Sequence, residues 1–406
     1  MTAIKNKQGI VMRTRAFLVA LIAMFYIVGP QTVYAQEAAP IKVGVTASLS
    51  GRLAEPGSEQ LKGLQMWAHD LNARGALLGR RVEVVHYDDK SDPDTSASLY
   101  DRLINQDKVD LLVGPYSSDI TLAASSTTER YKFPMVAAGA SSSKIWSRGY
   151  QNIFGIDAPA IAYMNLLIQS AKENAGLTRI ALVYGGSDEF PIEVAQGVRE
   201  QAAKHGMKIV FDAEYHPDTT DFSGLVQRMK ASNPELVIGC TYLNSSIELV
   251  REAKKQQLSP KAFAFTVGPA LPAFGEALGE DAEGIMGVTS WMRSGNIPMA
   301  YDFSYRYKAK YGHNADAYAA YGYAAGQVLE AAVRLAGSLS KDDIRQQLQD
   351  MIFHSLLGLY DADETGKQLG KSIYVMQRQQ GYRLLVLPKQ LRDSPIQYPF
   401  KPWSER

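Results

Sequence analysis

Short apolar runs alternate with amphipathic helical segments along most of the chain, and this alternation is the feature that most restricts the fold. The first predicted strands are residues 41–49, 81–87, 109–113 and 133–138, with helical spacing of apolar residues between them. Short, continuously apolar strands are typical of a parallel sheet that is covered by helices on both faces. The order of the elements therefore predicts an α/β fold.

The same alternation begins again after Asp157. Predicted strands follow at residues 180–184, 208–214, 236–239 and 262–267, with helices at 163–172, 194–205 and 246–255. Two successive units of similar size predict two lobes with parallel sheets. We expect segment 285–291 and the helix 318–335 to return to the first lobe, and strands 372–378 and 382–387 to pair as a hairpin.

The first thirty-five residues have the pattern of a cleaved secretory signal peptide. Basic residues without acidic ones precede an apolar run at 16–28, Gly29-Pro30 ends that run, and Val33-Tyr34-Ala35 provides a cleavage site. The apolar run is shorter than the roughly 20 residues that a membrane-spanning helix needs. We therefore expect a periplasmic protein whose mature chain begins at Gln36.

Charge and composition exclude several function classes. Removing the four basic residues of the leader lowers the formal charge from +1 to −3, and no basic block remains, which argues against nucleic acid as a partner. Cys240 is the single cysteine, so no internal disulfide can form. The histidines lack metal-ligand spacing, and no phosphate-binding fingerprint or nucleophile elbow is present. We expect no metal, no cofactor and no catalytic residues.

Serine-rich loops follow two neighbouring predicted strands of the first lobe. Ser117-Ser118 and Ser141-Ser142 stand where helices begin, beyond the carboxyl ends of strands, which is where open parallel sheets bind ligands. Hydroxyl groups and free N–H groups at helix N-termini can hold a carboxylate without an arginine. The alternative is that these serines only cap their helices.

A series of short motifs, kept in order over more than three hundred residues, supports a family resemblance. The motifs are Ile41-Lys42-Val43-Gly44, Ser48-Leu49-Ser50-Gly51, His86-Tyr87-Asp88-Asp89, Arg148-Gly149-Tyr150, Asp221-Phe222-Ser223 and Ala282-Glu283-Gly284. With them the mature chain resembles the periplasmic solute-binding proteins of ABC transporters, of the leucine/isoleucine/valine-binding type. The resemblance implies two Rossmann-like lobes joined by three crossings and closing on a ligand between them. We place the N-terminal lobe at 36–157 plus 289–371 and the C-terminal lobe at 158–288 plus 372–406.

The resemblance also implies a set of ligand-binding residues. Ser118 would donate to a ligand carboxylate, Gly139 would offer its carbonyl to an ammonium group, and Ser141 would bind the head group through its hydroxyl and N–H. Phe190 and Tyr242 would close over the ligand from the second lobe. The remaining expected ligand-binding residues are Tyr116, Ala140 and Val267.

Val267 is a departure from the family pattern. The amino-acid binders of the family usually hold the ammonium group with an acidic residue at this position. An ammonium group left without a charged partner costs several kcal/mol when buried, against about −8 kcal/mol for micromolar binding. Either the ligand lacks an α-ammonium group, or Asp188 or Glu189 replaces the missing acid, or the alignment is shifted.

The expected function is that of a binding protein, not an enzyme. It would capture an amino acid or related small carboxylate or amide and deliver it to the membrane permease of an ABC importer, acting as a monomer. One alternative is a ligand-sensing protein for an aromatic or other non-amino carboxylic acid. Another is a secreted α/β hydrolase, which would need a nucleophile held by a base that the sequence does not display.

Overall fold

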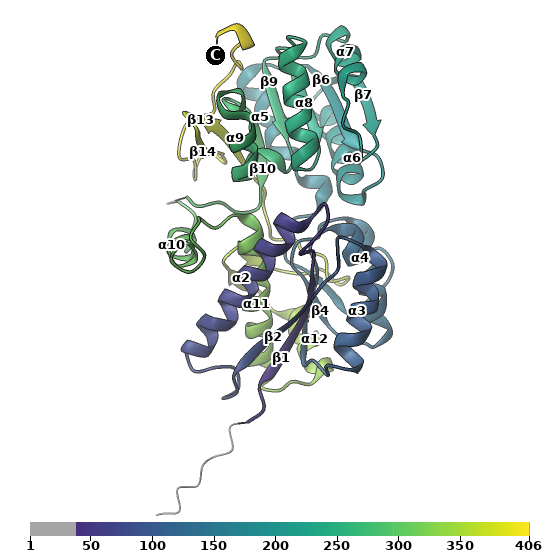
Figure 1. Cartoon of the computed structure of the whole chain (residues 1–406), viewed down its shortest axis with the longest axis vertical. Helices are drawn as coiled ribbons and strands as arrows, with labels where there is room; N and C mark the ends of the chain where they lie inside the picture. The colour runs from purple at the N-terminus through teal and green to yellow at the C-terminus, as the bar shows by residue number, and fades with distance from the viewer. Residues whose placement is uncertain (1–37, 295, 406) are drawn as a thin grey trace, which may run out of the picture. The chain divides into compact units, whose positions relative to one another are not determined.

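The computed structural model describes residues 38–294 and 296–405, and the predicted leader at 1–35 lies outside these residues. Within Pro40–Arg406 the chain forms an α/β fold with two lobes, each built on one main sheet (Figure 1). This confirms the predicted fold class. The limits of the lobes in sequence remain a prediction.

The sheet of the first lobe has five strands in the order β2-β1-β3-β4-β5, and all neighbours are parallel. Its strands are β1 (Ile41–Ala47), β2 (Val82–Asp88), β3 (Leu111–Val113), β4 (Met135–Ala137) and β5 (Ile153–Gly155). The connecting helices are α2 (Ala54–Ala73), α3 (Pro93–Asn105), α4 (Ser118–Arg130) and the short 3₁₀ helix η1 (Ser143–Ile145).

Core residues alternate between the two faces of this sheet because successive side chains of a strand point in opposite directions. Leu111 and Val113 belong to the core beneath α2, whereas Leu112 belongs to the core beneath α3 and α4. Both faces are therefore covered, and the loops at the carboxyl ends of the strands are left to form a site.

The sheet of the second lobe has seven strands in the order β14-β13-β10-β9-β8-β6-β7. Its strands are β6 (Arg179–Gly185), β7 (Lys208–Tyr215), β8 (Leu236–Cys240), β9 (Ala262–Phe265), β10 (Met286–Thr289), β13 (Tyr374–Gln379) and β14 (Tyr382–Leu387). Its helices are α5 (Asn165–Ala175), α6 (Glu189–Lys204), α7 (Ser223–Ala231), α8 (Leu243–Lys255) and α9 (Pro272–Leu278), with the short η2 (Ala160–Ala162), η3 (Gly268–Ala270) and η4 (Gly279–Ala282).

The predicted hairpin is confirmed, since β13 pairs antiparallel with β14 and also with β10. The prediction for segment 285–291 is wrong in part, because β10 pairs with β9 inside the second sheet. All four of its residues are buried, as is typical of a central strand covered on both faces. The chain leaves this sheet only after Thr289.

Helices α10 (Ala300–Tyr311), α11 (Ala317–Ala336) and α12 (Lys341–Asp350) follow, with a small antiparallel pair, β11 (Phe353–Ser355) and β12 (Gly358–Tyr360). As expected, α11 packs in the first lobe, against α2. A Cβ atom on Gly322 would lie 1.8 Å from the carbonyl oxygen of Gln60, and one on Gly63 would lie 1.9 Å from that of Ala319. The two helices approach so closely because these positions are glycines.

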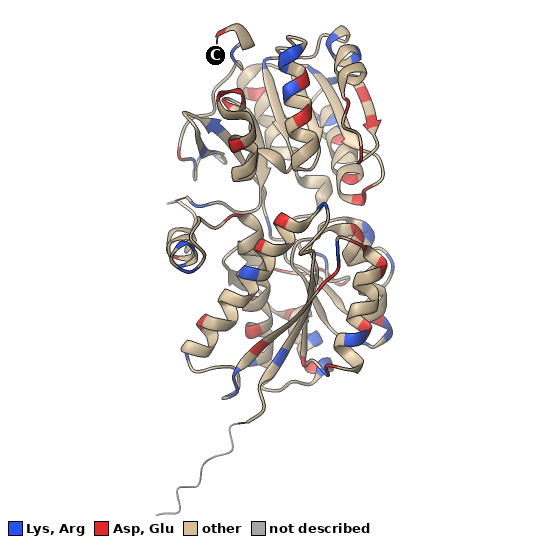
Figure 2. Ribbon diagram, viewed as in Figure 1, with Lys and Arg blue, Asp and Glu red and all other residues tan. Residues whose placement is uncertain are grey.

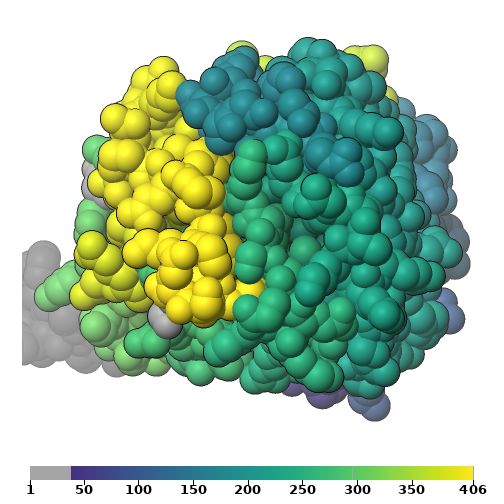
Figure 3. All heavy atoms as spheres, turned by 90° about the horizontal axis from the view of Figure 1, so that it is seen from above, coloured from purple at the N-terminus to yellow at the C-terminus, as the bar shows by residue number. Residues whose placement is uncertain are grey.

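The C-terminal segment, which ends in the 3₁₀ helix η5 (Trp403–Glu405), lies along the second lobe (Figure 3). The amide of Phe400 donates to the carbonyl oxygen of Lys261 at 2.7 Å, and the indole of Trp403 donates to that of Leu258 at 2.8 Å. Basic and acidic residues are interspersed along the ribbons of both lobes (Figure 2). None of the helices within 38–294 and 296–405 has the length and apolar character that membrane crossing requires.

Candidate functional site: a cavity between the two lobes

A cavity of about 50 Å³ lies where the strand ends of the two lobes meet. Residues of both lobes line it: Tyr116, Ser117, Ser118, Gly139, Ser141, Asp157, Tyr163, Phe190, Tyr242, Thr266, Val267, Ala270, Leu271, Val288, Thr289, Ala317, Tyr318 and Tyr321. These described residues include one carboxylate and no lysine or arginine. The wall is therefore built of hydroxyl groups, backbone, aromatic rings and aliphatic side chains.

Seven of the eight residues predicted from the sequence line this one cavity. They are Tyr116, Ser118, Gly139, Ser141, Phe190, Tyr242 and Val267. The eighth, Ala140, does not line it, because its side chain is buried in the core beneath α3 and α4. The structure thus brings together loops that follow β3, β4, β6, β8 and β9.

The two serine loops of the first lobe are bonded to each other. The hydroxyl oxygen of Ser118, at the start of α4, accepts from the amide of Ser141 at 3.3 Å and from that of Ser142 at 3.1 Å. Ser117 caps α4 by accepting from Ile120, and its φ of +80° is strained for a residue with a side chain. Backbone strain of this kind is often found at functional sites, and both serines line the cavity.

Aromatic rings close the cavity from both lobes. Phe190 packs edge-on against Tyr163 with a centroid distance of 5.0 Å, and its ring lies 6.3 Å from that of Tyr242. Tyr116 makes a similar edge contact with Tyr318 at 5.0 Å. Sequence reasoning found three of these rings but missed Tyr163, Tyr318 and Tyr321. The last two lie on α11, whose apolar pattern indicated only a core helix.

Asp157 is a further cavity residue that sequence reasoning missed. Its side chain is buried and accepts hydrogen bonds from the hydroxyl groups of Tyr163 and Ser290 and, at 2.8 Å, from the amide of Ala158. Burial raises the pKa of this carboxyl above its usual value. Its position directly after β5 was the available signal, but that strand has only three residues and went unpredicted.

Val267 lies in the cavity wall, so no acid stands at that place. Asp188 and Glu189, the alternatives considered from the sequence, do not line the cavity. Asp188 pairs with Arg52 of the first lobe at 2.7 Å, and Glu189 pairs with Lys144 at 2.6 Å. Both carboxylates are thus engaged in ion pairs between the lobes.

The first turns of α6 form the main polar contact between the lobes. Besides these ion pairs, the carboxylate of Glu193 accepts from the hydroxyl of Ser142 at 2.8 Å and from the amide and hydroxyl of Ser143 at 2.7 and 2.6 Å. The amide of Glu189 donates to Asp119 at 3.3 Å. Burial and the nearby Asp188 raise the pKa of Asp119 to about 6. The lobes are therefore held together directly beside the cavity.

Comparison with known proteins identifies the family. The model of the periplasmic binding protein family matches residues 40–383. The Leu/Ile/Val-binding protein of Escherichia coli is 27% identical over 81% of this chain and 88% of its own length, and a Leu/Ile/Val-binding protein homolog of Brucella abortus is 24% identical over 90% and 96%.

Solved structures have the same fold. The substrate-binding protein of a branched-chain amino acid transporter from Streptococcus pneumoniae, in complex with isoleucine, has a TM-score of 0.79 at 22% identity, covering 89% of this chain and all of that one. A solute-binding protein from R. palustris, in complex with benzoate, has a TM-score of 0.75 at 19% identity and covers 89% and 98%. The chain belongs to the periplasmic binding protein family.

Proposed function

We propose that this chain is the extracytoplasmic solute-binding component of an ABC importer. In this role it works in the periplasm as a monomer, binds an amino acid or a related small carboxylate or amide between its lobes, and delivers it to a membrane permease. The observation that carries the proposal is the gathering of seven predicted ligand-binding residues around one cavity. Relatives named for leucine, isoleucine and valine binding support it.

The donors around the cavity suit a ligand carboxylate. The hydroxyl of Ser118 and the hydroxyl and amide of Ser141 lie at the ends of β3 and β4, next to the first turn of α4. Such hydrogen bonds to an ionised group contribute about 1.5–3 kcal/mol each. The carbonyl of Gly139 already accepts from the amide of Ser117 at 3.0 Å and keeps one lone pair for a ligand donor.

The cavity offers little negative charge to the ammonium group of a ligand. Val267 offers none, and Asp157 is already bonded by three donors and has a raised pKa. We therefore propose that the ligand binds chiefly through its carboxylate and an apolar or aromatic body. The aromatic rings of the wall match such a body, and a neighbour crystallised with benzoate has the same fold.

Ligand entry requires the lobes to separate. Ligand pockets of drug-sized molecules have volumes of about 300–1,000 Å³, whereas the closed cavity measures about 50 Å³. Contacts such as Arg52 with Asp188 and Glu193 with Ser142 would break on opening and re-form on closure. A ligand that touches both lobes shifts the population toward the closed state.

Isothermal titration of the mature chain tests this proposal. Leucine, isoleucine, their deaminated analogues and benzoate form one series, and turnover of the corresponding esters and amides is measured in parallel. We expect saturable binding without turnover, with the deaminated acids bound at least as tightly as the amino acids. Ester or amide hydrolysis that disappears in a single serine-to-alanine variant would instead support the hydrolase alternative.

A further inference from the structure

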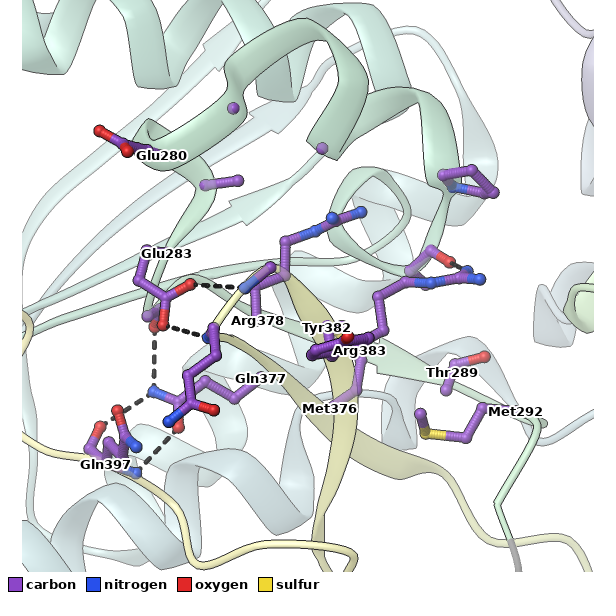
Figure 4. Close-up of a pocket in the computed structure, with 18 of the residues that line it drawn as sticks. Glu280, Glu283, Thr289, Met292, Met376, Gln377, Arg378, Tyr382, Arg383 and Gln397 are labelled. Atoms are coloured by element: carbon purple, nitrogen blue, oxygen red, sulfur yellow. Dashed lines mark hydrogen bonds between the residues drawn. The ribbon is translucent and has the colours of Figure 1, made fainter.

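A second and much larger cavity, of about 1,370 Å³, lies beside the β13–β14 hairpin of the second lobe (Figure 4). Helix α9, the crossing at residues 291–293, segment 314–317 and the C-terminal segment form its other walls. Ala270, Thr289 and Ala317 line this cavity on one side and the first cavity on the other. The two cavities are therefore neighbours separated by a thin wall.

Two arginines from the hairpin line the second cavity as a directly opposed pair. Arg378 on β13 is in register with Arg383 on β14. Like charges at opposed positions of an antiparallel pair are unfavourable. Arg378 is moreover only 5% exposed, which makes its charge still harder to accommodate.

The protein satisfies these guanidinium groups in part, through backbone carbonyls. Arg378 donates to the carbonyl oxygens of Pro269, at 3.2 Å, and of Leu271, and Arg383 donates to that of Ala270. Within residues 38–294 and 296–405, neither guanidinium has a carboxylate within ion-pair distance. Burial, together with the mutual repulsion of the pair, lowers the pKa of Arg378 to about 10.

The acids around the second cavity do not neutralise this pair by contact. Glu276 and Glu280 are exposed. Glu283 accepts from the amides at the tip of the hairpin, at 2.7 and 3.2 Å, and Asp316 caps α11 by accepting from Ala319 at 3.0 Å. Glu276, Glu283 and Asp316 therefore act on these cations only through attraction at longer range, and neither guanidinium forms an ion pair within the described residues.

Further features fit a bound molecule. The Arg378 guanidinium lies over the ring of Phe274 at 5.4 Å, and it fits there because position 275 is glycine, where a Cβ atom would lie 2.1 Å from Nη1. Trp291, which is among the residues that line the cavity, has a buried indole N–H without a hydrogen-bond partner in the described chain. Unsatisfied donors of this kind call for an explanation in a native structure.

We propose that the second cavity binds a small oxyanion, a carboxylate or phosphate group, between Arg378 and Arg383. A guanidinium offers a planar fork of donors that matches the oxygens of either group. An anion placed there offsets the repulsion between the two arginines. This site is separate from the one in the proposed function and does not depend on it.

Titration calorimetry with two probes, succinate and inorganic phosphate, tests the proposal on the mature chain at ionic strength held constant with chloride. We expect saturable binding of at least one probe. Arg378→Gln and Arg383→Gln should each weaken it tenfold or more, and Arg383→Lys should weaken it less. Arg293→Gln is the matched control, because Arg293 lines the same cavity but stacks on Tyr301.

The double variant Ser118→Ala with Ser141→Ala separates the two sites. It should keep the oxyanion binding that the arginine variants lose. Oxyanion binding that disappears in the serine variant and survives in the arginine variants would place the anion in the first cavity and overturn this proposal, while leaving the proposed function standing. If the arginine variants fail to fold, crystals of the wild-type chain grown with phosphate provide the test. Phosphate density against Arg378 and Arg383 supports the proposal, and its absence overturns it.

Discussion

The two neighbouring cavities differ in the charge of the groups that we propose for binding an anion. The first, of about 50 Å³, has hydroxyl groups, amides and a single carboxylate among its described lining residues. The second, of about 1,370 Å³, has two guanidinium groups anchored on three consecutive carbonyls. Neutral donors can bond to one another when no ligand is present, as Ser118 does with Ser141. Two cations cannot bond to each other, and a bound anion would offset their repulsion.

This difference in charge fits a difference in movement between the two sites. The polar groups of a site that opens and closes need hydrogen-bond partners in both states. Hydroxyl groups and helix N-termini meet this need more easily than charged side chains do. The two arginines lie on the β13–β14 hairpin and donate to the carbonyls of residues 269–271 after β9, so the fold fixes the position of their charge. The following predictions test this contrast in order of decreasing effect.

We expect the largest loss of affinity when the proposed carboxylate donors of the first cavity are removed. In the double variant Ser118→Ala with Ser141→Ala, binding of the best solute measured by calorimetry should weaken about 100-fold or more, because two hydrogen bonds to a carboxylate at about 1.5–3 kcal/mol each are lost. Ser304→Ala is the control, since the buried hydroxyl of Ser304 has no partner in the described chain. Unchanged affinity in the double variant would rule out the site.

The next effect changes the charge of the first site. Val267→Glu should shift the preference toward α-amino acids over their deaminated analogues by about tenfold or more, because it supplies a carboxylate for an ammonium group in the cavity wall. Val267→Gln is the matched control, with the same length and no charge. The ratio of the two dissociation constants measures the effect. An identical ratio in both variants would show that residue 267 does not face the ligand head group.

A smaller loss of affinity should follow when the hydrogen bonds that hold the two lobes closed are weakened. Glu193→Gln should weaken solute binding by about three- to tenfold, because the charge behind three hydrogen bonds between the lobes is lost. Glu200→Gln serves as the control on the same helix, where Glu200 accepts from the exposed Gln196 and, among the described residues, makes no hydrogen bond or ion pair with the first lobe. Calorimetry gives the affinity, and small-angle scattering should show a more open ligand-free population for Glu193→Gln alone. Equal scattering from both variants would contradict this role.

The smallest effect is a dependence on pH. Burial raises the pKa of Asp119 and of Asp316 to about 6 each, above the unfolded value of about 3.9. These acids bind more protons in the folded state, so the stability they contribute is present below about pH 4 and lost as the pH rises through 6. Urea unfolding should give a higher stability at pH 5 than at pH 7.5, and Asp119→Asn should reduce the difference by about 1–2 kcal/mol. An unchanged difference in that variant would show that Asp119 does not titrate in this range.

Much of the first site was predictable because its serine loops follow strands that are successive in sequence and adjacent in the sheet. β3 and β4 are neighbours joined by α4, and their carboxyl ends meet at one edge of the sheet. Recognising the two strands was therefore enough to bring Ser118 and Ser141 together. Phe190 and Tyr242 came from the resemblance, and they lie in the corresponding loops of the second lobe.

The residues that were missed come from segments whose place depends on the crossings between the lobes. Asp157 follows the three-residue β5, and Tyr318 and Tyr321 lie on α11, about 200 residues beyond Ser118. One face of α11 packs on α2, and its first turns also reach the cavity. Apolar spacing identifies such a helix but does not say which of its aromatic residues meet a ligand.

The sequence by itself determined the α/β class, most of the strands and the serine loops, because these depend on periodicity and on the fixed geometry of parallel strands. Only the tertiary structure decided that Val267 and Asp157 share a cavity, that Glu193 bonds to the opposite lobe and that Arg378 donates to carbonyls 107 and 109 residues away. The physical reason is that such contacts join segments remote in sequence. Their partners are set by how the lobes and the hairpin pack, and no local pattern encodes that packing.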